Sequence, residues 1–132
     1  MVRVLKGRRA PWSLLLVAAL PALAPTAAPA ADPTKGQAVF AAQCSLCHSN
    51  APNGPVILGP PLYGVVGRPA GSVRGFHYSQ AMTSAGFAWT PDRLRAYLPA
   101  PRAYLPGVKM TYAGLKNPSQ ADDLIAYLAT LH

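Results

Sequence analysis

The 132-residue sequence predicts a small all-α domain in which three main helices alternate with long loops. At three places a capping residue is followed by proline, which is favoured at the first position of a helix: Asp32-Pro33, Thr90-Pro91 and Asn117-Pro118. Between His48 and Trp89 the chain keeps neither the two-residue period of a β-strand nor the 3.6-residue period of a helix. We therefore expect a helix near each end of the domain, a third between them, and loops elsewhere.

The first and last helices are expected to pack through small and apolar faces. In the first helix, which runs into Cys44, Gly36 and Phe40 are four residues apart and so share one face. The last helix has Gln120 three residues after Asn117, a spacing that resembles a capping box. Its apolar residues recur at helical spacing and predict a buried stripe of Ala121, Leu124, Ile125, Leu128 and Leu131.

The middle helix is expected to be short. It begins at Pro91 and stops at or before Pro99, because proline cannot continue a helix. Its inward-facing side chains are predicted to be Leu94, Tyr97 and Leu98.

Cys44, Cys47 and His48 have the C-x-x-C-H spacing that attaches a c-type haem. Two thiols three residues apart on a helical turn can each reach one vinyl group of the same porphyrin, and the histidine can turn towards the iron. A redox-active cysteine pair, half of a zinc site or two ordinary buried cysteines are the alternatives. A zinc site needs a second pair of ligands, whereas His77 and His132 are isolated. The segment therefore predicts one haem c, covalently bound through Cys44 and Cys47.

The haem also accounts for the long irregular segment after His48. Seven of the ten glycines that follow residue 30 lie between His48 and Trp89. A loop of this length is unusual in a compact domain, but a large planar cofactor can itself serve as a core. We expect the haem-free chain to be largely unfolded, since so small a domain buries too little apolar surface by itself.

The start of the chain has the pattern of a secretory signal peptide. An apolar stretch over residues 14–20 follows a basic start, and Ala28-Pro29-Ala30 offers a small-x-small cleavage site. The basic residues are Arg3, Lys6, Arg8 and Arg9. We expect residues 1–31 to be a signal peptide cleaved near residues 30/31, and residues 32–132 to form one domain. A retained membrane anchor is the alternative, but Pro21 and Pro25 interrupt the apolar run.

Cleavage would change the charge from which partners are inferred. Four of the twelve Lys and Arg residues precede Ala30, whereas all four acidic residues follow it, so the remaining chain has a net charge of +4. Its basic residues form no dense run, which argues against a nucleic-acid partner. A mildly positive face for an acidic protein partner is favoured. No cysteine is left for a disulfide, because both would carry the haem.

The second axial ligand of the haem is not decided by these patterns. Met82 and Met110 are the only methionines after residue 30. Met110 lies just after the turn expected at Pro106-Gly107, where a loop can present its sulfur. Filling a gap in the core is the ordinary role of a methionine, so both remain open on this ground.

A series of motifs occurs along the whole domain in a fixed order. They are Cys44-x-x-Cys47-His48, Gly59-Pro60, Gly67-Arg68, Gly75-Phe76-x-Tyr78, Trp89, Tyr97-Leu98, Tyr104-Leu105-Pro106-Gly107-x-Lys109-Met110, Ala113-Gly114 and Asp123-Leu124-Ile125-Ala126-Tyr127-Leu128. In this order the chain resembles class I cytochrome c, close to the mitochondrial and bacterial periplasmic branch. The resemblance implies the small cytochrome c fold, with three main helices plus loops wrapped around a covalently attached haem.

The resemblance also implies roles for individual residues. His48 would be the proximal ligand and Met110 the distal ligand of the iron. Pro60 would offer its backbone carbonyl to the second nitrogen of His48, and Tyr97 would lie beside the ligand sulfur. The positions that hold the haem propionates are matched by Arg68, Tyr78 and Trp89.

The same resemblance predicts how the terminal helices cross. Gly36 and Phe40 match the positions where the first helix crosses the last at Leu124 and Tyr127. A glycine at the crossing lets the two backbones approach closely.

Three residues depart from the family pattern. Val108 replaces a usual threonine that donates to a propionate, and Met82 replaces an asparagine near a buried water. We expect these two changes together to shift the reduction potential. Tyr112 replaces a more usual phenylalanine at the exposed haem edge. Few basic residues surround the ligand loop, so steering of a partner should be weaker than in the lysine-rich mitochondrial type; those nearest are Arg102, Lys109 and Lys116.

His/Met ligation closes the iron to substrates and raises its potential. The resemblance therefore implies a soluble one-electron carrier, not an enzyme, that shuttles electrons between periplasmic or membrane-bound respiratory or photosynthetic complexes. We expect redox protein partners (a membrane oxidase, a reductase complex or a dehydrogenase), no nucleic acid, no integral membrane span, and a monomer in the periplasm. A haem enzyme or gas-binding protein with a labile Met110 bond is the competing class, and a subunit docked to one dehydrogenase or oxidase is a third.

Overall fold

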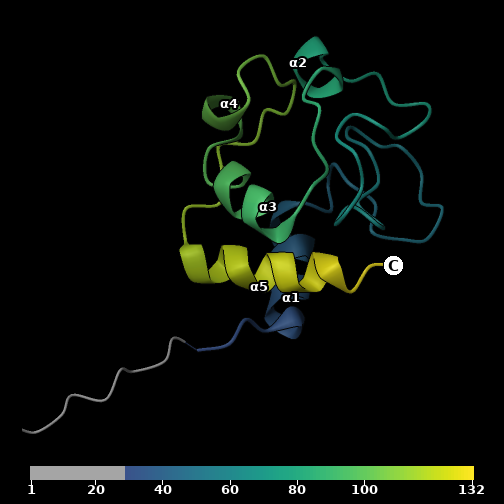
Figure 1. Cartoon of the computed structure of the whole chain (residues 1–132). Coiled ribbons are helices and arrows are strands. Elements are labelled where there is room, and N and C mark those ends of the chain that lie inside the picture. The colour runs from purple at the N-terminus through teal and green to yellow at the C-terminus, as the bar shows by residue number, and fades with distance from the viewer. Residues whose placement is uncertain (1–28) are drawn as a thin grey trace, which may run out of the picture.

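The computed structural model describes residues 29–132, so the expected signal peptide lies outside the described residues apart from residues 29–31. The described part contains five helices and no β-strand (Figure 1). They are α1 (Pro33–Gln43), α2 (Gln80–Thr83), α3 (Pro91–Tyr97), α4 (Pro101–Tyr104) and α5 (Pro118–Ala129). The predicted all-α fold is confirmed, since the only sheet-like pairing in this part is two isolated bridges, His48 with Val56 and Pro69 with Ala88.

All three predicted helix starts are confirmed. Asp32 Oδ1 accepts from the Thr34 N–H at 2.8 Å, and Thr90 Oγ1 accepts from the Arg93 N–H at 3.2 Å. The middle helix ends at Tyr97, before Pro99, as predicted. The one-turn helices α2 and α4 were not predicted, because four residues are too few to show a 3.6-residue period.

The largest contact between helices is the crossing of α1 and α5, visible in the lower part of Figure 1. At Gly36 the two backbones are so close that a Cβ atom would lie 1.9 Å from the carbonyl oxygen of Asp123. One turn later, the rings of Phe40 and Tyr127 pack with their centroids 5.8 Å apart. The expected crossing is therefore present, with Leu124 buried at its centre.

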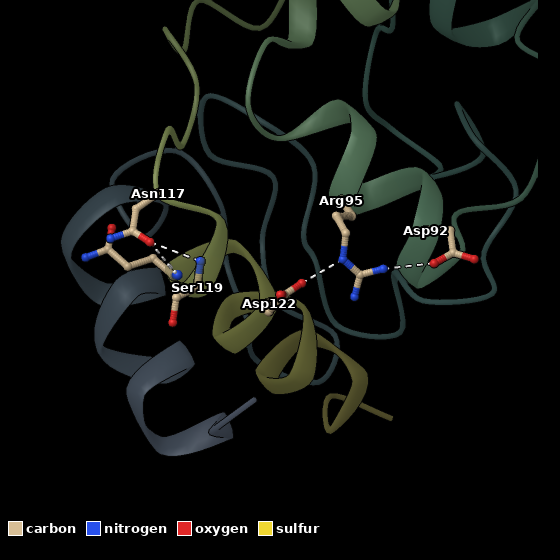
Figure 2. Close-up of polar contacts among 6 residues, drawn as sticks. Asp92, Arg95, Asn117, Ser119 and Asp122 are labelled. Atoms are coloured by element: carbon tan, nitrogen blue, oxygen red, sulfur yellow. Dashed lines mark hydrogen bonds and ion pairs between the residues drawn. The ribbon is translucent and has the colours of Figure 1, made fainter. Parts of the chain in front are cut away.

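Polar contacts join the ends of these helices. The N–H of Asp32 donates to Asp123 Oδ1 at 2.7 Å, which ties the start of α1 to the side of α5. Figure 2 shows Arg95 of α3 between two carboxylates, with Nε 2.7 Å from Asp122 of α5 and a terminal nitrogen 2.9 Å from Asp92. The same view shows the cap of α5, in which Asn117 Oδ1 accepts from the Ser119 N–H at 3.0 Å.

The core lies between α1, α3 and α5 and continues into the loops. Its buried apolar residues are Phe40, Val65, Met82, Trp89, Leu94, Tyr97, Leu98, Leu115, Ala121, Leu124, Ile125, Tyr127 and Leu128. The predicted stripe of α5 is buried except for Leu131, which is only partly covered. No helix among residues 29–132 is long and apolar enough to cross a membrane.

The segment between His48 and Trp89 forms turns against this core, as predicted, apart from α2. It is anchored where the Trp89 N–H donates to the Arg68 carbonyl at 2.9 Å and the Gly67 N–H donates to the Trp89 carbonyl. Gly67 has a φ of 88°, a left-handed conformation that suits glycine. The turns therefore bring Arg68 and Trp89 side by side.

Candidate haem site

A cavity of about 560 Å³ opens between the helices and the irregular segment. The structure brings all nine predicted site residues to its wall: Cys44, Cys47, His48, Pro60, Arg68, Tyr78, Trp89, Tyr97 and Met110. Most of the remaining wall is apolar and is built by the core. Residues 66 positions apart in the sequence thus face one enclosed space.

His48 is held on the wall by its backbone and by its ring. Its Nδ1 lies 2.7 Å from the carbonyl oxygen of Pro60. A carbonyl can only accept a hydrogen bond, so Nδ1 carries the proton and Nε2 is left with a lone pair. Burial lowers the pKa of His48, opposed by the bond to Pro60 and aided by the positive charge of Arg68. The neutral imidazole is therefore prepared for a metal at Nε2.

Gly59 makes room for the His48 ring. A Cβ atom at Gly59 would lie 2.4 Å from His48 Cε1 and 2.8 Å from Nδ1. The Gly59 N–H also donates to the Cys47 carbonyl at 2.8 Å, which fixes the loop against the cysteine segment. Gly59-Pro60 is one of the motifs on which the family resemblance rests, but the need for glycine at this position follows only from the packing of the ring.

The two cysteines lie on one helical turn at the end of α1. The N–H groups of Cys47 and His48 donate to the Cys44 carbonyl at 3.1 and 3.0 Å. Burial, and secondarily the nearby Cys47, raises the pKa of Cys44 to about 11. A redox-active cysteine needs the opposite, a lowered pKa, so the geometry disfavours that alternative. Residues 29–132 also contain no cluster of three or more His, Cys, Asp or Glu side chains that could hold a zinc ion.

Met110 faces the same cavity from a loop. The Val108 N–H donates to the Leu105 carbonyl at 3.1 Å, and Gly107 has a φ of 91°, which together form the expected Pro-Gly turn. The hydroxyl of Tyr97 donates to the sulfur of Met110 at 3.3 Å. Burial raises the pKa of Tyr97 to about 12, so the hydroxyl keeps its proton.

Met82 is buried and lines the same cavity as Met110. Both methionines predicted as candidates are therefore near the site. The bond from Tyr97 distinguishes them, because it orients the sulfur of Met110 alone.

One end of the cavity is polar. Arg68 donates from its two terminal nitrogens to the carbonyls of Tyr63 at 3.0 Å and Pro61 at 2.9 Å. Burial raises the pKa of Tyr78, opposed by a backbone hydrogen bond and by the charge of Arg68. Together with the buried Trp89, these groups provide positive charge and hydrogen-bond donors where carboxylates of a ligand would need them.

A family model for cytochrome c matches residues 33–132. The chain belongs to the cytochrome c family. It is similar to the cytochrome c2 of Rhodomicrobium vannielii, with 48% identity over 103 residues that cover 78% of this chain and 82% of that protein. The cytochrome c2 of Rhodopila globiformis is 45% identical over 79% of this chain and 97% of that protein. The cytochrome c of Chlamydomonas reinhardtii is 44% identical over 76% of this chain and 90% of that protein.

As a cytochrome c, the protein carries one c-type haem bound covalently through Cys44 and Cys47, and it transfers electrons. The site fits this group on its own chemistry. Two thiols, an imidazole with Nε2 unprotonated, apolar walls and a cluster of polar side chains surround a single cavity. The predicted haem c is thereby confirmed.

One contact of this cytochrome c was not foreseen from its sequence. The hydroxyl of Tyr112 donates to Gln43 Oε1 at 2.5 Å, which joins the ligand loop to the last residue of α1. The two residues are 69 positions apart, so no local pattern could have indicated the bond. Val108 lines the cavity with an apolar side chain, so it supplies no donor at its position.

Proposed function

We propose that this cytochrome c is a periplasmic one-electron carrier whose iron is held by His48 and Met110. A single observation carries the proposal: the two side chains share one cavity, and each has its ligand atom oriented by a hydrogen bond. Pro60 holds the ring of His48, and Tyr97 holds the sulfur of Met110. The protein itself would then supply both residues that hold the iron, His48 and Met110.

The residues around the haem would act by holding its two ligands, His48 and Met110, in fixed positions. When bound, the haem supplies an iron that alternates between ferrous and ferric states. The bond from His48 Nδ1 to Pro60 keeps Nε2 unprotonated, and the hydroxyl of Tyr97 keeps the thioether aligned. A thioether ligand favours the ferrous state and so raises the potential. The apolar wall would exclude water, and the charge of Arg68 with the donors beside it would stabilise the propionates.

Closed coordination leaves no position at the metal for a substrate. We therefore propose that the protein is not an enzyme and that electrons pass through the haem edge. Its partners would be redox proteins: a membrane oxidase, a reductase complex or a dehydrogenase. No nucleic acid is proposed as a partner, because the charge that remains after residue 30 is only +4 and forms no dense run.

The proposed location in the periplasm rests on a signal for export at the start of the sequence. The basic start, the apolar stretch and the small-x-small site support a signal peptide over residues 1–31 with cleavage near residues 30/31. Residues 32–132 would then be the working domain, a monomer in the periplasm. Mass measurement of the exported protein tests the cleavage, and a retained leader would overturn it.

Optical spectra of the exported protein test the ligation. The ferric form should show a sulfur-to-iron charge-transfer band, and the ferrous form should not respond to CO at neutral pH. Met110→Ala should lose the band and gain CO binding, whereas the matched Met82→Leu should keep the band. Loss of the band in Met82→Leu alone would place the ligand at Met82 instead. A CO response in the unaltered protein would overturn the carrier in favour of a gas-binding protein or a haem enzyme.

A further inference from the structure

One acidic side chain of this cytochrome c is buried. Asp123 is 8% exposed, whereas the other three acids of the chain reach solvent. It lies on α5 where that helix meets α1, so close that a Cβ atom at Gly36 would lie 1.9 Å from the Asp123 carbonyl oxygen. A carboxylate withdrawn from water needs hydrogen bonds and a positive charge nearby.

The structure supplies the hydrogen bond but not the charge. Asp123 Oδ1 accepts from the N–H of Asp32 at 2.7 Å. Two ion pairs occur in the part of the chain that the structure describes, and both belong to Arg95, with Asp92 and with Asp122. No lysine, arginine or histidine side chain in that part therefore pairs with Asp123.

The N–H group that Asp123 contacts lies next to the expected cleavage site. The small-x-small pattern of Ala28-Pro29-Ala30 places the cut after Ala30, so the exported domain would begin at Ala31. Its new α-ammonium group would lie one residue before the Asp32 N–H, and consecutive Cα atoms are about 3.8 Å apart. A cut one residue later would make the Asp32 nitrogen itself the amino terminus. Either cut brings a positive charge within reach of the Asp123 carboxylate.

We infer that the amino terminus created by cleavage is the cationic partner of Asp123, and that processing on export thereby completes the packing of α1 on α5. This inference rests on the proposed removal of the signal peptide. An α-amino group carries a positive charge at pH 6. The same nitrogen in the uncleaved chain is an uncharged amide, so the precursor would leave Asp123 without this partner.

The other carboxylate at the start of α1 is already engaged. A positive charge at a helix N-terminus is unfavourable with respect to the helix dipole, so the ammonium group needs a carboxylate there. Asp32 caps the helix, since its Oδ1 accepts from the N–H groups of Thr34 and Lys35. Asp123 accepts from one N–H at Oδ1, and an ionised carboxylate can accept at both oxygens. Asp123 is therefore the carboxylate that suits the ammonium group.

Acetylation of the amino terminus tests the pair in the exported holoprotein. Mass measurement first identifies the first residue, which should be Ala31 or Asp32. Selective acetylation of the α-amine then removes its charge without altering a side chain. At pH 6 and low salt we expect the midpoint of thermal unfolding to fall by about 5 °C, because loss of one partner leaves a buried charge unpaired.

Two variants assign the effect to one carboxylate. Asp123→Asn keeps an oxygen that can accept from the Asp32 N–H but has no charge, so acetylation should change its midpoint by less than about 1 °C. The matched control is Asp122→Asn, which alters the neighbouring residue of α5, whose partner is Arg95. In this control acetylation should still lower the midpoint by about 5 °C.

A crystal structure of the processed protein gives a second test that needs no variant. The amino nitrogen should lie within about 4 Å of an Asp123 oxygen. This measurement decides the matter if Asp123→Asn does not fold.

The outcomes separate the ion pair from the cleavage on which it rests. A retained leader, or a first residue other than Ala31 or Asp32, would overturn the cleavage and the pair with it. An unchanged midpoint after acetylation of the wild type, an equal fall in Asp123→Asn, or an amino nitrogen far from Asp123 in the crystal would overturn the pair and leave the cleavage standing. Loss of the effect in Asp122→Asn as well would assign it to the overall charge of α5 and likewise overturn the pair.

Discussion

The two walls of the haem cavity are built in different ways. The wall that carries His48 comes from one short stretch, in which backbone bonds join Cys44, Cys47 and His48, and the neighbouring Gly59 and Pro60 complete it. The wall that carries Met110 depends on side chains from distant parts of the chain. Bonds that hold it run from Tyr97 to the Met110 sulfur, from Tyr112 to Gln43, and from Lys109 to the His77 carbonyl.

This difference indicates how each wall should respond to change. A wall made of backbone bonds and close packing has few ways to adjust, so a substitution there should disturb the fold. A wall held by single side-chain bonds can lose one of them at a cost of about 1 kcal/mol and remain folded. Variants at His48 and its neighbours should therefore affect stability, and variants around Met110 should affect ligation.

Removing the haem should have the largest effect, because both walls of the cavity then lose the cofactor that they enclose. Cys44→Ser combined with Cys47→Ser should give a chain without cooperative unfolding, since a domain of about 100 residues with an empty cavity of this size has too small a core. Circular dichroism during heating measures this. The intact protein under the same conditions is the control, and a sharp native-like transition in the haem-free chain would contradict the expectation.

Gly59→Ala should cause the next largest loss, on the His48 wall. The new methyl group would lie 2.4 Å from His48 Cε1, so the ring would have to move and its bond to Pro60 would weaken. We expect a loss of roughly 1–3 kcal/mol in the free energy of unfolding. Guanidinium unfolding followed by the Soret band measures it.

Gly75→Ala is the matched control for this change. Gly75 also lies in a loop, but a Cβ atom there would have no other atom within 4 Å. Because Gly75 has a φ of 81°, the variant reports backbone strain alone. Its Soret spectrum should be unchanged, whereas that of Gly59→Ala should shift. Equal spectra in the two variants would show that the His48 ring accommodates the new methyl group without moving relative to the haem.

Tyr97→Phe should act on the Met110 wall. Loss of the hydroxyl removes the donor to the sulfur, so the charge-transfer band should disappear at lower denaturant concentration than in the wild type. The free energy of global unfolding should change by only about 1 kcal/mol. Tyr104→Phe, which removes a hydroxyl from the neighbouring ring, should leave the band unaffected. If the loss of the charge-transfer band and global unfolding moved to lower denaturant concentration together, the distinction between the two walls would be contradicted.

The same variant should change the response to alkaline pH. The pKa of Tyr97 is 10.0 as a free side chain and about 12 in the folded protein, so folding favours its protonated form. Its contribution to stability is complete below pH 10 and is lost as the pH rises towards 12. Wild type should therefore lose more stability than Tyr97→Phe over this interval, as measured by urea unfolding at each pH.

Tyr112→Phe should give the smallest effect. Its bond to Gln43 is exposed, so its loss should cost about 0.5 kcal/mol and make the charge-transfer band slightly more sensitive to denaturant. Gln43→Ala should do the same, and the double variant should add nothing further, since both remove one bond. Additive effects would show that the two residues act separately.

Much of the fold could be predicted because its signals are local. Asp32-Pro33, Thr90-Pro91 and Asn117-Pro118 each predict a helix start from two neighbouring residues, and all three occur. The helices α2 and α4 were missed because a single turn shows no period and owes its place to the surrounding chain.

The sequence by itself determined the attachment of the haem, the helix starts and the family. These depend on residues close together in the chain or on motifs in a fixed order, which can be read without coordinates. Only the tertiary structure decided that Gly59 must leave room for His48, that Tyr97 and Tyr112 hold the ligand loop, and that Leu46 and Ile57 remain exposed. The physical reason is that steric contact and side-chain hydrogen bonding join residues by distance in space, and folding alone sets that distance.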